Sequence, residues 1–206
     1  MASFYISPIG TFRYPWFNKP DTKFNADGLF HTELHLSGKQ AEELAAKIEA
    51  AAHAALAEHT QEMKPGEAKK WSLYLPFERI EDDEGNPTGD IKFDFKQNAK
   101  IPLKDGSVKD VRIELRDSKD NIITVPVWDG SEGRIMFTMR PITMAQAKEA
   151  GVRLDFAKVQ ITKLANGSGG GGRGFGEVED GFVADTEGRG FGNAQSNEPE
   201  GEAEDY

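Results

Sequence analysis

The chain has 206 residues, no cysteine and a formal net charge of −10. The absence of cysteine excludes disulfides, thiolate metal sites and a cysteine nucleophile, and it fits a reducing, cytoplasmic setting. No run of 18 or more apolar residues occurs, so we expect no membrane contact, and the N-terminal residues lack the pattern of a signal peptide. The length suggests one folded domain with an appendage, or two very small domains.

Alternation of apolar and polar residues predicts strands through most of the first 165 residues. The predicted strands cover residues 11–16, 30–36, 71–75, 91–96, 111–116, 122–127, 134–140 and 153–163. In the first of them, Phe12, Tyr14 and Trp16 should share one strand face. Asp117–Asn121 has the composition of a hairpin turn, and Glu81–Pro87 that of an exposed hairpin tip.

One long helix interrupts the strands. Ser37 is placed as its N-cap, with Gln40 at the spacing of a capping box, and Pro65-Gly66 ends it. Its apolar stripe comprises Leu44, Ile48, Ala52, Ala55, Leu56 and Met63. A second, short helix is predicted over Thr143–Gly151, with the glycine beyond its C-terminus. Many short strands with two inserted helices predict a mainly β antiparallel barrel.

A glycine run beginning at Asn166 divides the chain into a folded domain, 1–165, and a flexible tail, 166–206. Gly-Arg-Gly-Phe-Gly occurs twice in the tail, at Gly172–Gly176 and Gly188–Gly192. The tail holds 10 acidic and 2 basic residues, and the domain 25 acidic and 23 basic residues. The domain is therefore close to neutral and could present a locally positive groove, while the tail holds most of the negative charge.

The domain carries the two elements that a sequence-tolerant binder of single strands needs, which are cations for phosphates and aromatic faces for bases. The candidate contacts are Arg13, Tyr14, Trp16, Lys19, Tyr74, Phe77, Arg79, Lys92, Lys96, Arg112 and Arg116. Its four aromatic members are expected to be exposed, because they lie at strand ends or beside prolines. Phe93 and Phe95 are assigned to the core. The basic pairs on the strands fit a solvated face equally well.

No enzymatic signature or cofactor motif is present. His31-Thr-Glu-Leu-His35 differs from a zinc-protease motif because its glutamate stands one place late and the segment is predicted as a strand. We expect these side chains to line one polar face without a metal. Serine-triad signatures, phosphate-binding glycine loops and dinucleotide fingerprints are absent.

One set of features occurs in a characteristic order and spacing, namely Ile9–Thr11, Lys19–Asp21, the strand and alanine-rich helix of Leu29–Met63, Asp117–Lys119, Val125–Leu164 and Glu179–Ala184. Together these motifs resemble the replicative single-stranded DNA-binding proteins of tailed bacteriophages. This resemblance implies an OB-fold barrel and sequence-independent binding of single-stranded DNA in the host cytoplasm. It also implies a tail that contacts the replisome. The family typically ends in phenylalanine, whereas this chain ends in Tyr206.

The end of the tail is predicted to bind partners such as the cognate DNA polymerase and the helicase or primase, with the protein a monomer or weak homodimer. The tail residues assigned to this role are Glu202, Glu204, Asp205 and Tyr206. An aromatic anchor flanked by anions suits a pocket rimmed by Lys or Arg. Two alternatives stay open, an RNA-binding OB or cold-shock-like protein and a scaffold that binds no nucleic acid.

Overall fold

A computed structural model describes residues 3–23 and 25–165 of the chain. The predicted tail of residues 166–206 lies outside the described residues. In chain order the elements are β1 (Tyr5–Ile6), β2 (Gly10–Asp21), β3 (Leu29–Ser37), α1 (Gly38–Thr60), α2 (Pro65–Ala68), β4 (Ser72–Tyr74), β5 (Phe77–Glu81), β6 (Pro87–Asn98), β7 (Lys100–Pro102), β8 (Val108–Asp110), β9 (Glu114–Arg116), β10 (Ile122–Ile123), β11 (Glu132–Met144) and β12 (Glu149–Lys163).

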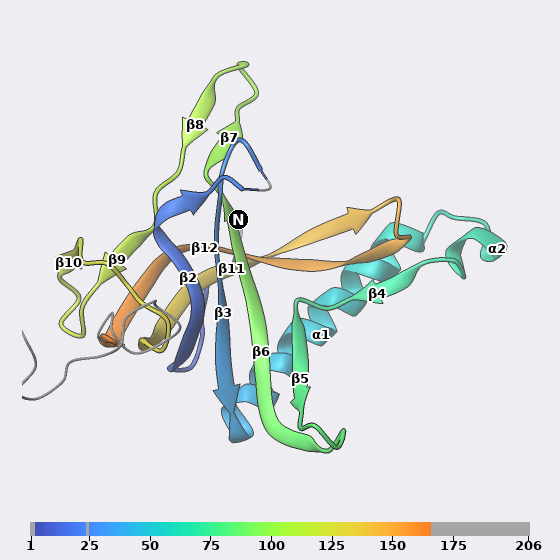
Figure 1. The fold of residues 1–206 in the computed structure, drawn as a ribbon. Helices are drawn as coiled ribbons and strands as arrows, with labels where there is room; N and C mark the ends of the chain where they lie inside the picture. Colours follow the sequence, from blue (N-terminus) through green and yellow to red (C-terminus); the bar gives the residue numbers. More distant parts are fainter. Residues whose placement is uncertain (1–2, 24, 166–206) are drawn as a thin grey trace, which may run out of the picture. The chain divides into compact units, whose positions relative to one another are not determined.

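Five long strands form the centre of the fold (Figure 1). β2, β3 and β6 make an antiparallel meander, β12 runs parallel to β6, and β11 pairs with both β12 and β2. The joins between β6 and β12 and between β11 and β2 are narrow, with two residue pairs each. The sheet therefore curls around a common core without closing into a complete barrel, as in an OB fold. The predicted mainly β OB fold is confirmed.

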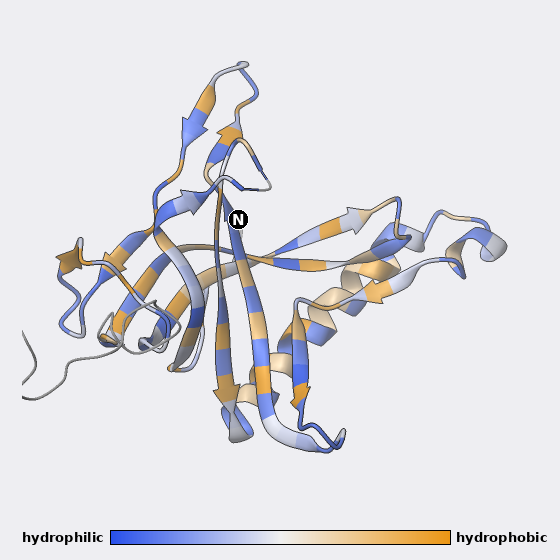
Figure 2. Ribbon diagram, in the orientation of Figure 1, coloured by the Kyte–Doolittle hydropathy of each residue, from blue (hydrophilic) through white to orange (hydrophobic). Residues whose placement is uncertain are grey.

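The core lies between the inner face of this curled sheet and α1. Apolar and polar residues alternate along the long strands, as Figure 2 shows by colour. In the described part of the chain, six phenylalanines are at most 2% exposed, namely Phe12, Phe17, Phe93, Phe95, Phe137 and Phe156. The core assignment of Phe93 and Phe95 is thus confirmed. Burial of each such side chain contributes roughly 1.5–3 kcal/mol, which makes these rings the main support of the sheet.

A bulge in β2 overturns the prediction that Phe12, Tyr14 and Trp16 share one face. Arg13 pairs with Glu33 and Trp16 pairs with His31, so β2 has one residue more than β3 between these two pairs. Tyr14 lies in this bulge and has a positive φ of 51°. Phe12 therefore points into the core and Tyr14 is exposed as expected, whereas Trp16 lies on the outer face but is only partly exposed.

The long helix is confirmed with changes at both ends. Ser37 is the N-cap, but its side chain makes no capping hydrogen bond, so the predicted capping box is not formed. The helix ends at Thr60, whose hydroxyl donates to the carbonyl oxygen of Leu56. Met63 therefore lies beyond the helix, and Pro65 begins the short helix α2 instead of ending α1.

The predicted helix over Thr143–Gly151 is wrong. These residues form the end of the β11–β12 hairpin, in which Thr143 pairs with Ala150. The hairpin turn uses Lys148 at a positive φ of 57°. Gly151 serves close packing, because a Cβ there would lie 2.0 Å from the carbonyl oxygen of Tyr74 on β4. Strand pairing on both sides outweighs the local helix signals.

The region from residue 100 to residue 127 is less regular than predicted. Only Glu114–Arg116 and Ile122–Ile123 are strands within the two segments predicted there, and β7 and β8 form a separate hairpin. The turn at Asp117–Asn121 is confirmed, since the Asp117 carboxylate accepts hydrogen bonds from two backbone N–H groups. Asp82 does the same at the predicted β5–β6 tip. In the described part of the chain, no helix has the length and hydropathy needed to cross a membrane.

Candidate nucleic-acid interface

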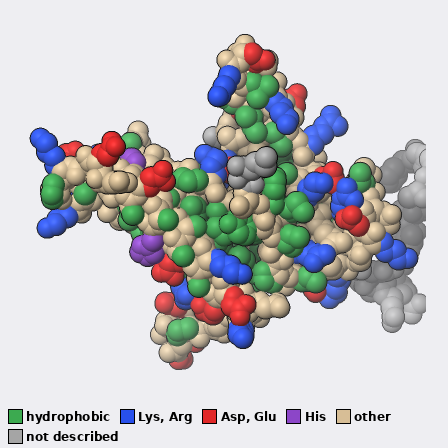
Figure 3. Space-filling model, turned by 180° about the vertical axis from the view of Figure 1, so that it is seen from behind, with side chains coloured by type: hydrophobic (Ala, Val, Ile, Leu, Met, Phe, Trp, Pro, Cys, Tyr) green, Lys and Arg blue, Asp and Glu red, His purple; other side chains and the backbone are tan. Residues whose placement is uncertain are grey.

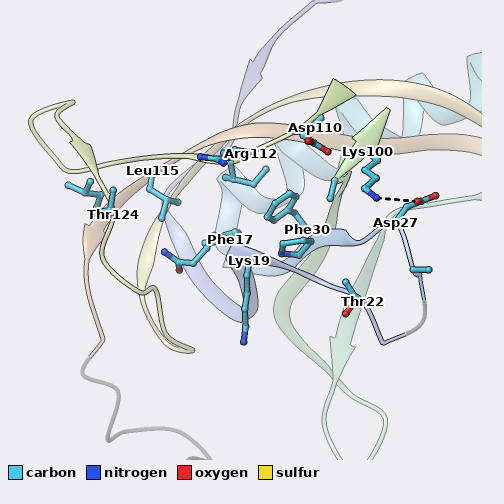
Figure 4. A pocket seen from close by; sticks show the side chains of 17 residues that line it. Phe17, Lys19, Thr22, Asp27, Phe30, Lys100, Asp110, Arg112, Leu115 and Thr124 are labelled. Carbon is cyan, nitrogen blue, oxygen red and sulfur yellow. Dashed lines mark ion pairs between the residues drawn. The ribbon is translucent and has the colours of Figure 1, made fainter. Parts of the chain in front are cut away.

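An open cavity of about 680 Å³ lies where β2 ends, beside the loop from β2 to β3 and the segment that follows β8. We call it the groove. Phe17 and Phe30, two core residues, reach its floor, and Lys19, Lys100 and Arg112 line it (Figure 4). In OB folds, the loop between the first two barrel strands and the outer face of the second and third strands bind oligonucleotides. The groove occupies this position.

Two cations of the groove are available for a ligand. Neither Lys19 nor Arg112, both exposed, has a carboxylate partner among the residues that the structure describes. The Lys19 ammonium instead lies 5.8 Å from the centre of the Trp16 ring. Lys100 is held near Asp27 at 3.9 Å, the ion pair drawn in Figure 4. Since exposed cations without carboxylate partners meet a phosphate at little desolvation cost, these side chains suit a nucleic-acid backbone.

The outer face of the sheet continues from the groove with one aromatic and basic row. Trp16, His31 and Lys96 are register partners across β2, β3 and β6. The rings of Trp16 and His31 are stacked, with centroids 6.0 Å apart. The His31 Nε2 lies 3.4 Å from an Asp21 oxygen. The pKa of Asp21 is lowered, chiefly by a hydrogen bond from the backbone N–H of Lys23.

The neighbouring rows of this face also carry charged side chains, but their cations are paired with carboxylates of the same protein. Glu33 and Asp94 stand directly opposite each other, and burial raises the pKa of Asp94. Lys92 forms an ion pair of 2.7 Å with Glu78, and this hydrogen bond is the main cause of its raised pKa. Arg13 is held by Asp129 at 2.8 Å. The aromatic and basic row beside the groove is therefore the part of the face that best suits an anion.

Phe77 and Arg79 lie away from the groove. They share the strand face that turns toward the core and α1, because Phe77 pairs with Phe93 and Arg79 with Ile91. Phe77 is 8% exposed, so the expectation that it is exposed is wrong. Arg79 donates to Glu42 of α1 at 2.9 Å.

Two further predicted contacts are also separated from the groove. Tyr74 is only partly exposed, beside β12, and burial is the main cause of its raised pKa. Arg116 bonds Glu114 and Asp120 and lines a different cavity, of about 240 Å³, together with Arg134 and Lys158. Arg112 and Arg116 therefore do not follow one groove, because the chain is a strand only from Glu114 onward.

Sequence reasoning missed Lys100 and Trp128. Lys100 lines the groove although its side chain belongs to the short strand β7. Trp128 is 49% exposed and lies beside β2, in a cavity that includes Tyr14 and Trp16. It stands two residues after Pro126, and nearness to a proline is the feature that singled out Trp16, which directly follows Pro15. That signal could have found it.

The polar face of β3 holds no metal-binding cluster. His31, Glu33 and His35 share the outer face as expected, and His35 Nε2 lies 3.1 Å from a Glu33 oxygen. Within residues 3–23 and 25–165, no three His, Cys, Asp or Glu side chains are grouped to hold an ion. The face shown in Figure 3 has hydrophobic side chains at its centre with acidic and basic ones interspersed around them.

An OB fold with exposed aromatic rings and unpaired cations at its strand end defines the class of proteins that bind single-stranded nucleic acids. A family model described as single-stranded DNA-binding protein of bacteriophage T7 matches residues 9–164. The chain belongs to this family, so the predicted resemblance is confirmed. The family is one of binding proteins and not of enzymes.

Solved structures agree on the fold. The crystal structure of gp2.5, a single-stranded DNA-binding protein encoded by bacteriophage T7, has a TM-score of 0.68 at 24% identity and covers 80% of this chain and 93% of its own. The single-stranded DNA-binding protein of bacteriophage Enc34 in complex with single-stranded DNA has a TM-score of 0.54 at 10% identity, covering 79% and 88%. Sequence comparison with individual curated proteins gives no match.

Proposed function

We propose that this chain binds single-stranded DNA without base preference along the groove and the adjoining row of Trp16, His31 and Lys96. The observation that carries the proposal is the pairing of an exposed Lys19 with the face of Trp16 at the edge of the groove. Family membership supports DNA as the ligand.

The chemistry of the groove favours single strands over duplex. Aromatic faces can stack only on bases that are not already stacked and paired, and each stacked base is worth roughly 1–3 kcal/mol. Lys19, Lys100 and Arg112 would contact the phosphates between those bases. Reading a duplex would need an element that enters the major groove, whereas α1 packs on β11 and β12. Side chains that stack on any base give no sequence preference.

In the cell, the proposed role is to protect single strands of phage DNA during replication and recombination in the host cytoplasm. The acidic tail would recruit the polymerase and the helicase or primase through Glu202, Glu204, Asp205 and Tyr206, and the protein would act as a monomer or weak homodimer. The charge and terminal aromatic ring of the tail support this part of the proposal.

A comparison of oligo-dT, oligo-rU and duplex DNA tests the proposal. Oligo-dT should bind tightest and duplex much more weakly, with affinity that falls as salt rises because counterions are released. Preference for oligo-rU would favour the RNA-binding alternative. Equal, weak binding of all three would favour a scaffold that does not bind nucleic acid.

A further inference from the structure

A second, apolar cavity of about 590 Å³ adjoins the groove, between β2 and residues 126–129. It shares Phe17, Asn18 and Lys19 with the lining of the groove, so the two cavities are neighbours along β2. Tyr14 and Trp128 line it with 66% and 49% of their surfaces exposed. Two large aromatic side chains held in solvent around one apolar cavity indicate a binding site. We call it the Tyr14–Trp128 cavity.

One wall of the cavity is fixed by Asp129. One oxygen of its carboxylate accepts a hydrogen bond from the backbone N–H of Tyr14, and the other accepts one from Arg13, each at 2.8 Å. Tyr14 has a positive φ of 51°, which is costly for an aromatic residue unless the surroundings support it. Asp129 therefore holds the Tyr14 backbone in the conformation that keeps the ring outside the core.

The other end is fixed by Asn18. Its side-chain amide donates to the carbonyl oxygen of Val125 at 2.9 Å and accepts from the N–H of Val127 at 3.1 Å. Two side chains of β2 and of the facing segment thus tie residues 125–129 to the strand. Trp128 stands between these ties, so the backbone that carries both aromatic rings is held in place before any ligand arrives, which reduces the ordering entropy lost on binding.

We propose that the Tyr14–Trp128 cavity receives one unstacked base of the bound strand, with Asp129 as a positioning residue. This inference rests on the proposed function, because the strand would enter from the groove past Lys19. Adjacency to the groove and the neighbouring cation Lys19 single out a nucleotide among the ligands that an aromatic cavity could hold. Stacking between aromatic rings accepts any base.

The first test measures the full-length chain and its Trp128→Ala variant with oligo-dT and with an abasic oligonucleotide of equal length at low salt. Loss of one stacked base should weaken oligo-dT binding about five- to 140-fold and leave abasic binding unchanged. Trp128→Phe should keep most of the affinity, since a smaller ring still stacks. Phe4→Ala is the control, because Phe4 is 70% exposed and lies outside the cavity lining.

The second test addresses Asp129. Asp129→Ala should reduce the preference for oligo-dT over the abasic oligonucleotide, because Tyr14 loses its support. Asp129→Asn should restore much of that preference, since an amide oxygen still accepts the Tyr14 N–H. Equal losses on both oligonucleotides would instead show a general effect on folding or charge, and would overturn the positioning role.

The outcomes separate this inference from the proposed function. If the unmodified chain binds neither oligonucleotide, the proposed function fails. If it binds both and Trp128→Ala changes the two affinities equally, the function stands and the base site is overturned. A Trp128→Ala effect that vanishes in a chain lacking Glu198–Tyr206 would make the tail the occupant, which also overturns it.

Discussion

At the scale of single residues, burial divides the predicted aromatic contacts into two kinds. Trp16 lies on the outer face beside Lys19, whereas Phe77 packs against Phe93 with ring centroids 5.6 Å apart. Substitution of Trp16 should therefore affect binding and substitution of Phe77 should affect stability, although the sequence predicted both residues to be exposed DNA contacts.

Trp16→Ala should weaken oligo-dT binding by roughly 1–3 kcal/mol with little change in the thermal midpoint. Phe77→Ala should cost roughly 3–5 kcal/mol of stability, because it leaves a cavity beside Phe93. Thermal melts and binding titrations of the two variants check this together. A large fall in midpoint for Trp16→Ala would place that ring in the core.

A second residue-level prediction concerns Asp94, whose pKa is raised by burial. A carboxyl with a raised folded-state pKa stabilises the fold while protonated, and that contribution is lost as pH rises from the unfolded-state pKa through the folded-state pKa. Asp94→Asn should therefore raise the thermal midpoint at neutral pH, and the gain should vanish as pH falls below about 4. Asp83→Asn on the exposed β5–β6 tip is the control. A pH-independent gain would contradict the burial argument.

At the scale of elements, the periodicity of apolar residues predicted those strands whose alternation follows directly from having one buried face. The long strands alternate because one face meets the core, so the positions of β3, β6, β11 and β12 were readable. The bulge at Tyr14 could not be predicted from periodicity, because it exists only in the pairing of β2 with β3, and its extra residue changes the face of the side chains that follow. The helix signals at Thr143–Gly151 failed because pairing with β4 is a tertiary contact, which local sequence does not encode.

The candidate site was likewise predictable only where local sequence determines the position of a residue. Aromatic and basic residues near the end of β2 were found, since composition marks them. Arg79 and Arg116 were misplaced because their strand faces depend on pairing with β6 and on where β9 begins. Lys100 joins the groove only through the fold of β7.

Gly151→Ala tests the close approach of β12 to β4. The new methyl group would lie 2.0 Å from the Tyr74 carbonyl oxygen, so the strands must move apart. We expect a loss of roughly 1–3 kcal/mol of stability, measured by chemical denaturation. Gly66→Ala is the matched control, because its Cβ would meet open space. Equal stability of the two variants would contradict the observed packing.

At the scale of the whole molecule, charge is distributed unevenly between a nearly neutral domain and a strongly acidic tail. A polyanion linked to a DNA-binding groove can compete with DNA for the same cations. The proposed tail function therefore has a binding consequence that is separate from partner recruitment.

Deleting Glu198–Tyr206 removes five acidic side chains and should tighten oligo-dT binding, most visibly at low salt, where screening is weak. The deletion should also abolish association with the polymerase or helicase. Tyr206→Ala should lose the partner but hardly change DNA affinity, since the side-chain charges stay. Unchanged DNA affinity after the deletion would remove competition from the account, and partner binding by Tyr206→Ala would remove the aromatic anchor.

The most direct test of the central claim compares two double variants of equal charge, Lys19→Ala with Arg112→Ala in the groove and Arg79→Ala with Arg116→Ala outside it. The salt dependence of oligo-dT binding is measured for both and for the unmodified chain. The groove variant should bind more weakly, with a salt slope shallower by about 1.4, since each lost phosphate contact on a single strand removes about 0.7. The other variant should keep the unmodified slope. Equal changes in both variants would contradict binding in the groove.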